Sequence, residues 1–195
     1  MMTVLMRSEE LIEKLEAGLA DYNPRRIDNP AATPAAVLLL LRSVEREPHV
    51  VFTERTSNVE HHKGQICFPG GGMMDSDATA EATALRETFE EIGVKSEHVR
   101  VIGQLDDILT VSAFRVSPFV GLFEHDPDYQ YTTCDVEVAQ VIEVPFSFLL
   151  EEGSMELEVR EHRGREVLVP SFSYDGHRIW GATARMLHQL IELVR

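Results

Sequence analysis

The apolar run at residues 35–41 constrains the fold of this chain more than any other feature. Its seven residues, Ala-Ala-Val-Leu-Leu-Leu-Leu, carry only aliphatic side chains, a pattern typical of a strand that is buried on both faces. The run is far too short to span a lipid bilayer, which needs about 20 apolar residues. A charged turn and a second strand at residues 49–54 are expected to follow it.

Helices are predicted on both sides of this pair of strands. Leucines at a spacing of four indicate a helix over residues 8–20, with Ser8 as its N-cap. A second helix is expected from about residue 78 to residue 92, with Ser76 or Asp77 as its cap. Each of these helices begins beside a polar residue whose side chain can accept a backbone hydrogen bond.

The remaining segments predict strands and a last helix. The glycine-rich segment 59–77 is expected to lack regular structure. Strands are predicted at 99–106, 115–124, 136–144, 155–161 and 166–169, and a helix at 182–193. This mixed order fits an α+β fold in which a sheet lies between helices. We expect one domain over residues 1–195, with an N-terminal helix and loop at 1–33 and a core with the C-terminal helix at 34–195.

The charge balance argues against several classes of partner. The chain has 18 Lys and Arg against 33 Asp and Glu, a net charge of −15. Such acidity argues against nucleic acid, whose binding needs clustered cations, and against anionic membranes. The N-terminus lacks the apolar core of a signal peptide, and Cys67 and Cys134 are too few for a disulfide framework. We therefore expect a cytoplasmic protein with no nucleic-acid or membrane partner.

Three glutamates mark the segment with the clearest chemistry. On the predicted helix Glu87, Glu90 and Glu91 stand at positions i, i+3 and i+4, so their carboxylates share one face. Clustered carboxylates repel one another, and they relieve that repulsion by binding a hard cation such as Mg²⁺ or Mn²⁺. Arg86 can pair with a glutamate and fix its rotamer. Taken alone, the triplet is also compatible with an acidic helix face that is merely solvated.

A glycine-rich loop precedes this helix. The run Phe68-Pro69-Gly70-Gly71-Gly72 allows close approach of the backbone, so that a carbonyl can reach a metal or an amide can reach a phosphate. A plain flexible turn is the alternative interpretation of these glycines. Neither the loop nor the glutamates alone would be a strong signal.

Together the loop and the helix resemble the Nudix box. In that motif a glycine and an acidic residue precede the sequence Arg-Glu-x-x-Glu-Glu-x-Gly, and residues 86–93 keep this second half intact. The first half departs from the motif and allows two registers. One places Gly72 and Ala78 at the glycine and the acidic position. The other places Gly71 and Asp77 there with one extra residue, and we prefer it because Asp77 supplies a carboxylate.

An upstream segment resembles the signature of the coenzyme A pyrophosphatase subfamily of Nudix hydrolases. The matching positions keep the spacing of that signature and are Thr53, Arg55, Gly64 and the block Phe68-Pro69-Gly70-Gly71. Glu60 stands where the signature has a second arginine, which reverses a charge. The match therefore favours the subfamily while leaving the substrate open.

The resemblance implies the Nudix fold, a mixed β-sheet between helices, and hydrolysis of a nucleoside diphosphate linked to another group. For the subfamily it implies that coenzyme A or a derivative is cleaved into 3′,5′-ADP and 4′-phosphopantetheine. Another substrate, such as ADP-ribose, NADH or a diadenosine polyphosphate, is the nearest alternative. A catalytically silent module that binds a nucleotide is a further alternative, although such a module should have lost some of the helix carboxylates.

The resemblance also implies roles for individual residues. Glu87, Glu90 and Glu91 are expected to hold Mg²⁺ or Mn²⁺ with the carbonyl of Gly71. Glu90 is the candidate base that accepts the proton of the attacking water, and Glu91 and Arg86 complete the expected catalytic helix face. A further carboxylate often comes from a later loop, for which Glu137 is the nearest candidate.

Two cations lie nearest to the motifs. Arg55 and Lys63 are expected to bind the phosphates of a small nucleotide substrate, with a solvated surface charge as the alternative for Lys63. A homodimer is a candidate assembly because Nudix proteins often pair.

Overall fold

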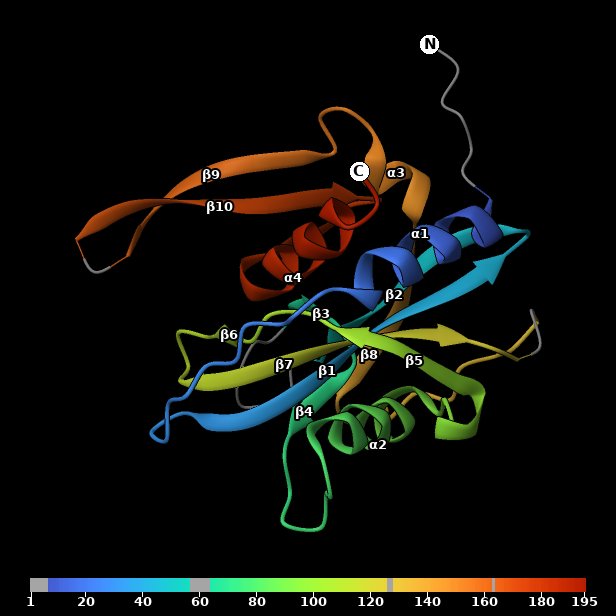
Figure 1. Ribbon diagram of the computed structural model, residues 1–195, viewed down its shortest axis with the longest axis horizontal. Coiled ribbons are helices and arrows are strands. Elements are labelled where there is room, and N and C mark those ends of the chain that lie inside the picture. The colour runs from blue at the N-terminus through green and yellow to red at the C-terminus, as the bar shows by residue number, and fades with distance from the viewer. Residues whose placement is uncertain (1–6, 57–63, 126–127, 163) are drawn as a thin grey trace.

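The computed structural model describes residues 7–56, 64–125, 128–162 and 164–195. Within these residues a large mixed sheet contains β1 (Thr33–Val44), β2 (Glu47–Arg55), β3 (Ile66–Cys67), β4 (Gly70–Gly72), β5 (Val99–Gln104), β6 (Ile108–Leu109), β7 (Phe114–Phe123) and β8 (Val138–Pro145). A smaller sheet contains β9 (Met155–His162), β10 (Arg165–Tyr174) and β11 (His177–Trp180). The helices are α1 (Ser8–Ala20), α2 (Ala80–Ile92), α3 (Phe146–Leu150), α4 (Gly181–Glu192) and the short 3₁₀ helix η1 (Ser96–His98). Figure 1 shows the large sheet between α2 on one side and α1 and α4 on the other, which confirms the predicted α+β fold.

Strand β1 lies at the centre of the large sheet. It pairs in parallel with β7 and antiparallel with β2. Its leucines alternate between two cores: Leu39 and Leu41 pack with residues of α1 and α4, whereas Leu38 and Leu40 pack with residues of α2. All four side chains are buried, so the prediction of a strand buried on both faces is confirmed. Helices cover both faces because successive side chains of a strand point in opposite directions.

Strand β1 changes its antiparallel partner along its length. Residues 40–44 pair with β2, whereas residues 35–37 pair with β4. At its far end β2 pairs with β3 through Thr53 and Glu54 in place of β1, while β8 pairs with β2 along residues 49–55. The prediction that residues 59–77 lack regular structure is therefore wrong for β3 and β4. Three glycines form a strand here through backbone pairing alone, which leaves no side-chain pattern in the sequence.

Two predicted helix caps are also wrong. Ser8 is the first helical residue of α1 rather than its N-cap, and its hydroxyl donates to the carbonyl of Arg46 at 3.0 Å. The N-cap of α2 is Thr79, whose hydroxyl accepts from the amide of Ala82 at 3.0 Å. The carboxylate of Asp77 instead accepts hydrogen bonds from the side chains of Thr83 and Arg86 within α2.

The other predicted elements agree with the structure to within a few residues. β6 and β11 were not predicted, and β10 continues through Pro170 to Tyr174, well past the predicted end at residue 169. Pro170 is tolerated because β11 pairs with β10 only from Ser171 onward, so the missing amide proton interrupts no bond to β11. No helix within the described residues is both long and apolar enough to cross a membrane.

Gly70 provides a test of this strand exchange. A Cβ atom at Gly70 would lie 2.3 Å from the carbonyl oxygen of Ala36, whereas a Cβ atom at Gly72 would meet no atom within 4 Å. We expect Gly70→Ala to lower the free energy of unfolding by about 2–3 kcal/mol, because β4 must move away from β1. Gly72→Ala is the matched control and should change it by less than about 0.5 kcal/mol. Equal effects in urea unfolding would contradict the close packing of β4 on β1.

Candidate active site

The three predicted glutamates line the face of α2 that meets β4. Glu91 is 3% exposed, and its carboxylate accepts a hydrogen bond from the amide of Gly70 at 3.3 Å. Glu87 packs so closely on Gly71 that a Cβ atom there would lie 2.5 Å from its carboxylate carbon. Glu90 is the most accessible of the three, with its side chain 51% exposed. The structure thus brings the glycine strand and the carboxylate helix together, as the sequence predicts.

Arg86 connects these parts through five hydrogen bonds. Its guanidinium donates to Glu87 at 2.8 Å and to Glu90 at 2.9 Å. It also donates to the carbonyl of Gly72 at 3.1 Å and to both oxygens of Asp77 at 2.9 Å each. Such a fork of parallel donors is available to arginine and not to lysine. The sequence predicts one glutamate partner for Arg86, whereas the structure gives it two glutamates, an aspartate and a backbone carbonyl.

Asp77 accepts two of the hydrogen bonds of Arg86. The hydrogen bonds from Arg86 hold the pKa of its carboxyl well below the usual range, and bonds from the amide of Met74 and the hydroxyl of Thr83 add to that effect. Asp77 is therefore fully ionised and anchors the loop that leads from β4 into α2. Its contact with Arg86 is consistent with the register of the Nudix box that starts at Gly71 and puts Asp77 at the acidic position.

Buried carboxyl groups accumulate beside Arg86. Burial, together with the charges of Glu87 and Glu137, raises the pKa of Glu91 to about 8 against the opposing effects of Arg55 and of the hydrogen bond from the amide of Gly70. Arg55 approaches Glu91 with 3.6 Å between guanidinium nitrogen and carboxylate oxygen. Burial raises the pKa of Glu87 as well. The carboxyl groups of the site therefore outnumber its two arginines, Arg55 and Arg86, which is a condition that a bound cation relieves.

Glu137 reaches the site on a loop that is bonded to the end of α2. The amide of Cys134 donates to the carbonyl of Glu91 at 2.9 Å, and the amide of Thr132 donates to that of Ile92 at 3.2 Å. The hydroxyl of Tyr129 donates to the carbonyl of Gly93 at 2.7 Å. These donors satisfy carbonyls that the helix itself leaves unpaired.

These loop donors were missed from the sequence. Gly93 ends the helix in a left-handed conformation with φ of 76°, and such an end predicts that donors are needed. It does not predict which residues supply them.

The donor set of the site fits a hard divalent cation. Oxygen ligands from Glu87, Glu90, Glu91 and the backbone of the glycine strand are the type that Mg²⁺ and Mn²⁺ prefer. As they stand, however, no three acidic, histidine or cysteine side chains in the described part of the chain converge closely enough to hold a metal ion. Arg86 occupies oxygens of Glu87 and Glu90. Cation binding therefore requires these side chains to rotate.

Of the two cations predicted to bind substrate phosphates, the structure describes only Arg55. Arg55 lies in the site beside Glu91. Lys63 and Glu60 fall outside the described residues. Tyr174 packs against the core and Trp180 lies under the guanidinium of Arg160, 5.0 Å from its ring centroid.

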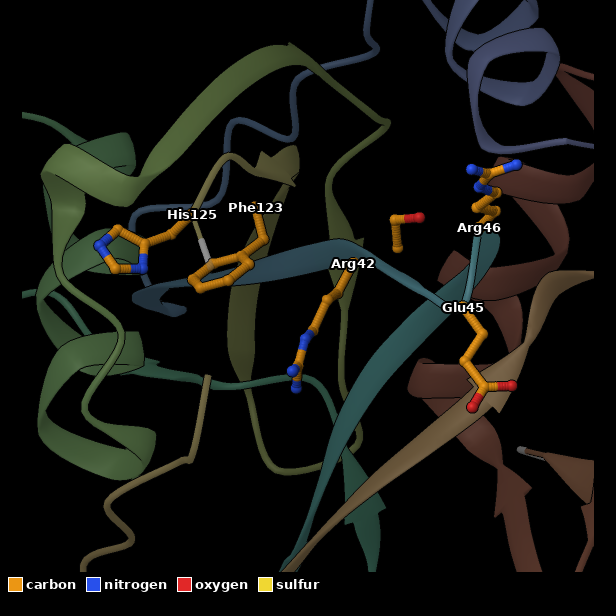
Figure 2. A pocket seen from close by; sticks show the side chains of 6 residues that line it. Arg42, Glu45, Arg46, Phe123 and His125 are labelled. Atoms are coloured by element: carbon orange, nitrogen blue, oxygen red, sulfur yellow. The ribbon is translucent and has the colours of Figure 1, made fainter. Parts of the chain in front are cut away.

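A cavity of about 440 Å³ lies away from these carboxylates, at the opposite end of β1. Figure 2 shows the side chains around it, and its lining residues are Arg42, Ser43, Glu45, Arg46, Phe123 and His125. Arg42 is committed to its surroundings, because its guanidinium pairs with Glu143 at 2.9 Å and lies over the ring of Tyr131. The cavity adds no residue to the carboxylate site.

Comparison with known proteins places this geometry in a family. Residues 32–159 match the family model described as NUDIX domain. The uncharacterised Nudix hydrolase NudL of Photorhabdus laumondii is 33% identical over 172 residues, which cover 88% of this chain and 90% of that protein.

Solved structures show the same fold at lower identity. A MutT/nudix family protein from Enterococcus faecalis has a TM-score of 0.56 at 15% identity, covering 86% of this chain and 64% of that one. The NUDIX domain of Shewanella oneidensis NrtR, solved with ADP ribose, has a TM-score of 0.50 at 17% identity, covering 74% of this chain and 87% of that one. The predicted Nudix fold is therefore confirmed. With the matched domain, the relative and the Arg-Glu-x-x-Glu-Glu-x-Gly helix in agreement, this chain belongs to the Nudix family and is a Nudix hydrolase, a pyrophosphohydrolase that acts on phosphorus-containing anhydrides.

Proposed function

We propose that this Nudix hydrolase cleaves the pyrophosphate linkage of coenzyme A or its derivatives and releases 3′,5′-ADP and 4′-phosphopantetheine. One observation carries the proposal. The coenzyme A pyrophosphatase signature spans residues 53–71, and Arg55 and Gly70, from its two ends, both contact the buried carboxylate of Glu91. Residues at both ends of the segment that resembles the subfamily thus belong to the carboxylate site.

The helix carboxylates are the proposed cation ligands. Nudix hydrolases generally need divalent metal ions, and Glu87, Glu90, Glu91 and the Gly71 carbonyl are the groups that would hold Mg²⁺ or Mn²⁺ here. When bound, such ions neutralise pyrophosphate charge and lower the pKa of a coordinated water. The raised pKa values of Glu87 and Glu91 support this assignment, because the site disfavours their ionised forms and a bound cation favours them.

Glu90 is the proposed acceptor of the water proton. Its carboxylate is half exposed and is held by one hydrogen bond from Arg86, so it can turn toward a substrate on the open side of α2. Glu137 is the alternative acceptor, since its charge acts on both Glu87 and Glu91. Arg55 and Lys63 are the proposed partners of the substrate phosphates, and a planar guanidinium suits a phosphate particularly well.

Product analysis tests the substrate. We expect purified protein with coenzyme A and Mg²⁺ or Mn²⁺ to release 3′,5′-ADP and 4′-phosphopantetheine, separated by reversed-phase chromatography, with no release in EDTA. Cleavage of ADP-ribose, NADH or a diadenosine polyphosphate with coenzyme A left intact would replace the coenzyme A assignment by another nucleoside diphosphate derivative. Silence on every substrate would instead favour a module that binds nucleotides without cleaving them.

The helix carboxylates can be tested one at a time. We expect Glu90→Gln and Glu91→Gln each to lower kcat by about 100-fold or more, because each removes a charged oxygen from the reacting site. Glu81→Gln is the matched control: Glu81 is exposed in the first turn of the same helix, and its loss should leave kcat within about twofold. Turnover within a few-fold of the parent in both site variants would rule out the proposed metal ligands.

Arg86 should matter for both stability and turnover. Arg86→Lys keeps the charge but cannot reproduce five hydrogen bonds, so we expect the free energy of unfolding to fall by about 2–3 kcal/mol and kcat to fall with it. Arg100→Lys is the control, because Arg100 pairs with Glu16 and Glu124 on the surface, where such pairs contribute little. Thermal unfolding and initial rates that respond equally to both substitutions would contradict the special place of Arg86.

A further inference from the structure

The threonine that follows β2 binds the loop that carries Glu137. The hydroxyl of Thr56 donates to the carbonyl of Val136 at 2.7 Å, and its amide donates to the carbonyl of Glu137 at 2.9 Å. Thr56 is 9% exposed, so its hydroxyl lies in the protein rather than in bulk water and needs a partner there. One residue thus fixes two successive carbonyls of the loop.

A bulge at the start of β8 decides which residue meets Thr56. The register of β2 with β8 shifts by one place just before Arg55, which pairs with Val138 and passes over Ala139. The unshifted register would set Val138 opposite Thr56, whereas the shifted one sets Glu137 there. Bulges are common beside active sites, where they redirect a side chain. The bulge and Thr56 together therefore place Glu137 beside the end of β2.

The same loop is closed on itself and bound to α2. The amides of Glu137 and Val138 both donate to the carbonyl of Cys134, at 2.9 Å and 2.8 Å, and the amide of Cys134 donates to the carbonyl of Glu91 at 2.9 Å. The amide and the carbonyl of Glu137 are thus both bonded, the carbonyl by Thr56. A backbone held at both groups fixes the direction in which its side chain leaves the loop.

Glu137 needs such a hold because other carboxylates repel it. It lies near enough to Glu87 and Glu91 for its charge to raise the pKa of both carboxyl groups. The same repulsion pushes the loop away from α2. The loop lies at the surface, where the side chain of Val136 is 69% exposed and packs little. Hydrogen bonds to the backbone of the loop therefore oppose the repulsion.

We propose that Thr56 is a positioning residue of this hydrolase, whose hydroxyl keeps Glu137 close to Glu87 and Glu91 during turnover. This role rests on the proposed function, in which Glu137 is a carboxylate of the reacting site. Thr56 acts through the backbone of the loop and not by contact with the substrate. Without the hydroxyl the loop can move outward, and a displacement of about 1 Å at a reacting group can lower turnover by about 100-fold.

A double-mutant cycle separates this role from a purely structural one. We expect Thr56→Val, which replaces the hydroxyl by a methyl group, to lower kcat for coenzyme A with Mg²⁺ by about tenfold and to leave KM within about twofold. Thr56→Ser keeps the hydroxyl and should hold kcat within about threefold of the parent. Glu137→Gln alone should lower kcat by about tenfold or more. In that background Thr56→Val should add less than about a twofold change, because the group that Thr56 positions is already lost.

Thr133→Val is the matched control on the same loop. The hydroxyl of Thr133 donates to the side chain of Asp135 at 3.4 Å and to neither carbonyl that Thr56 binds. The substitution removes a threonine hydroxyl as Thr56→Val does, and it should leave kcat within about twofold of the parent. If Thr56→Val fails to fold by circular dichroism, Thr56→Ala replaces it throughout.

Hydrogen exchange tests the hold on the loop without any substrate. We expect the amides of Glu137 and Val138 to exchange about tenfold faster in Thr56→Val than in the parent, while the amides of β1 exchange at the parent rate. Exchange in the loop that is unchanged by the substitution would overturn the proposal whatever the kinetics show.

Three kinetic results would also overturn it: Thr56→Val with the activity of the parent, Glu137→Gln with the activity of the parent, or a full loss from Thr56→Val in the Glu137→Gln background. If the parent leaves coenzyme A intact but cleaves ADP-ribose, the cycle is measured on ADP-ribose, and the coenzyme A assignment alone fails. A parent that cleaves neither substrate would overturn the proposed function and the role of Thr56 in turnover together.

Discussion

The hydrogen bonds of Arg86 are the interaction on which the rest of this site depends. A single guanidinium joins the loop through Asp77, the glycine strand through Gly72, and the helix through two glutamates. Because the fork is planar and its five donors are fixed in direction, it sets the position of β4 relative to α2. The narrow space between them follows, and it leaves no room for a side chain at Gly71, whose Cβ atom would meet the carboxylate of Glu87.

The same helix is held at its other end by a different kind of contact. The last carbonyls of α2 cannot bond within the helix, and they accept hydrogen bonds from Tyr129, Thr132 and Cys134 instead. Those residues belong to the loop that carries Glu137. The ordinary need to satisfy a helix end therefore delivers a fourth carboxylate to a face that already carries three. Burial and mutual repulsion then raise the pKa values of Glu87 and Glu91, an electrostatic state suited to cation binding.

The sequence by itself determined the parts whose signals are local. The run 35–41 predicts a buried strand because all its residues are apolar, and residues 86–93 predict one helix face with three carboxylates because helical spacing is regular. Only the tertiary structure decided which distant groups meet. β4 forms by backbone pairing and leaves no side-chain pattern. Asp77 binds Arg86 while Thr79 caps the helix, and Arg55 reaches Glu91 from β2. Each of these contacts depends on how segments that are far apart in the sequence pack together. A local sequence pattern carries no information about the distance between such segments in space.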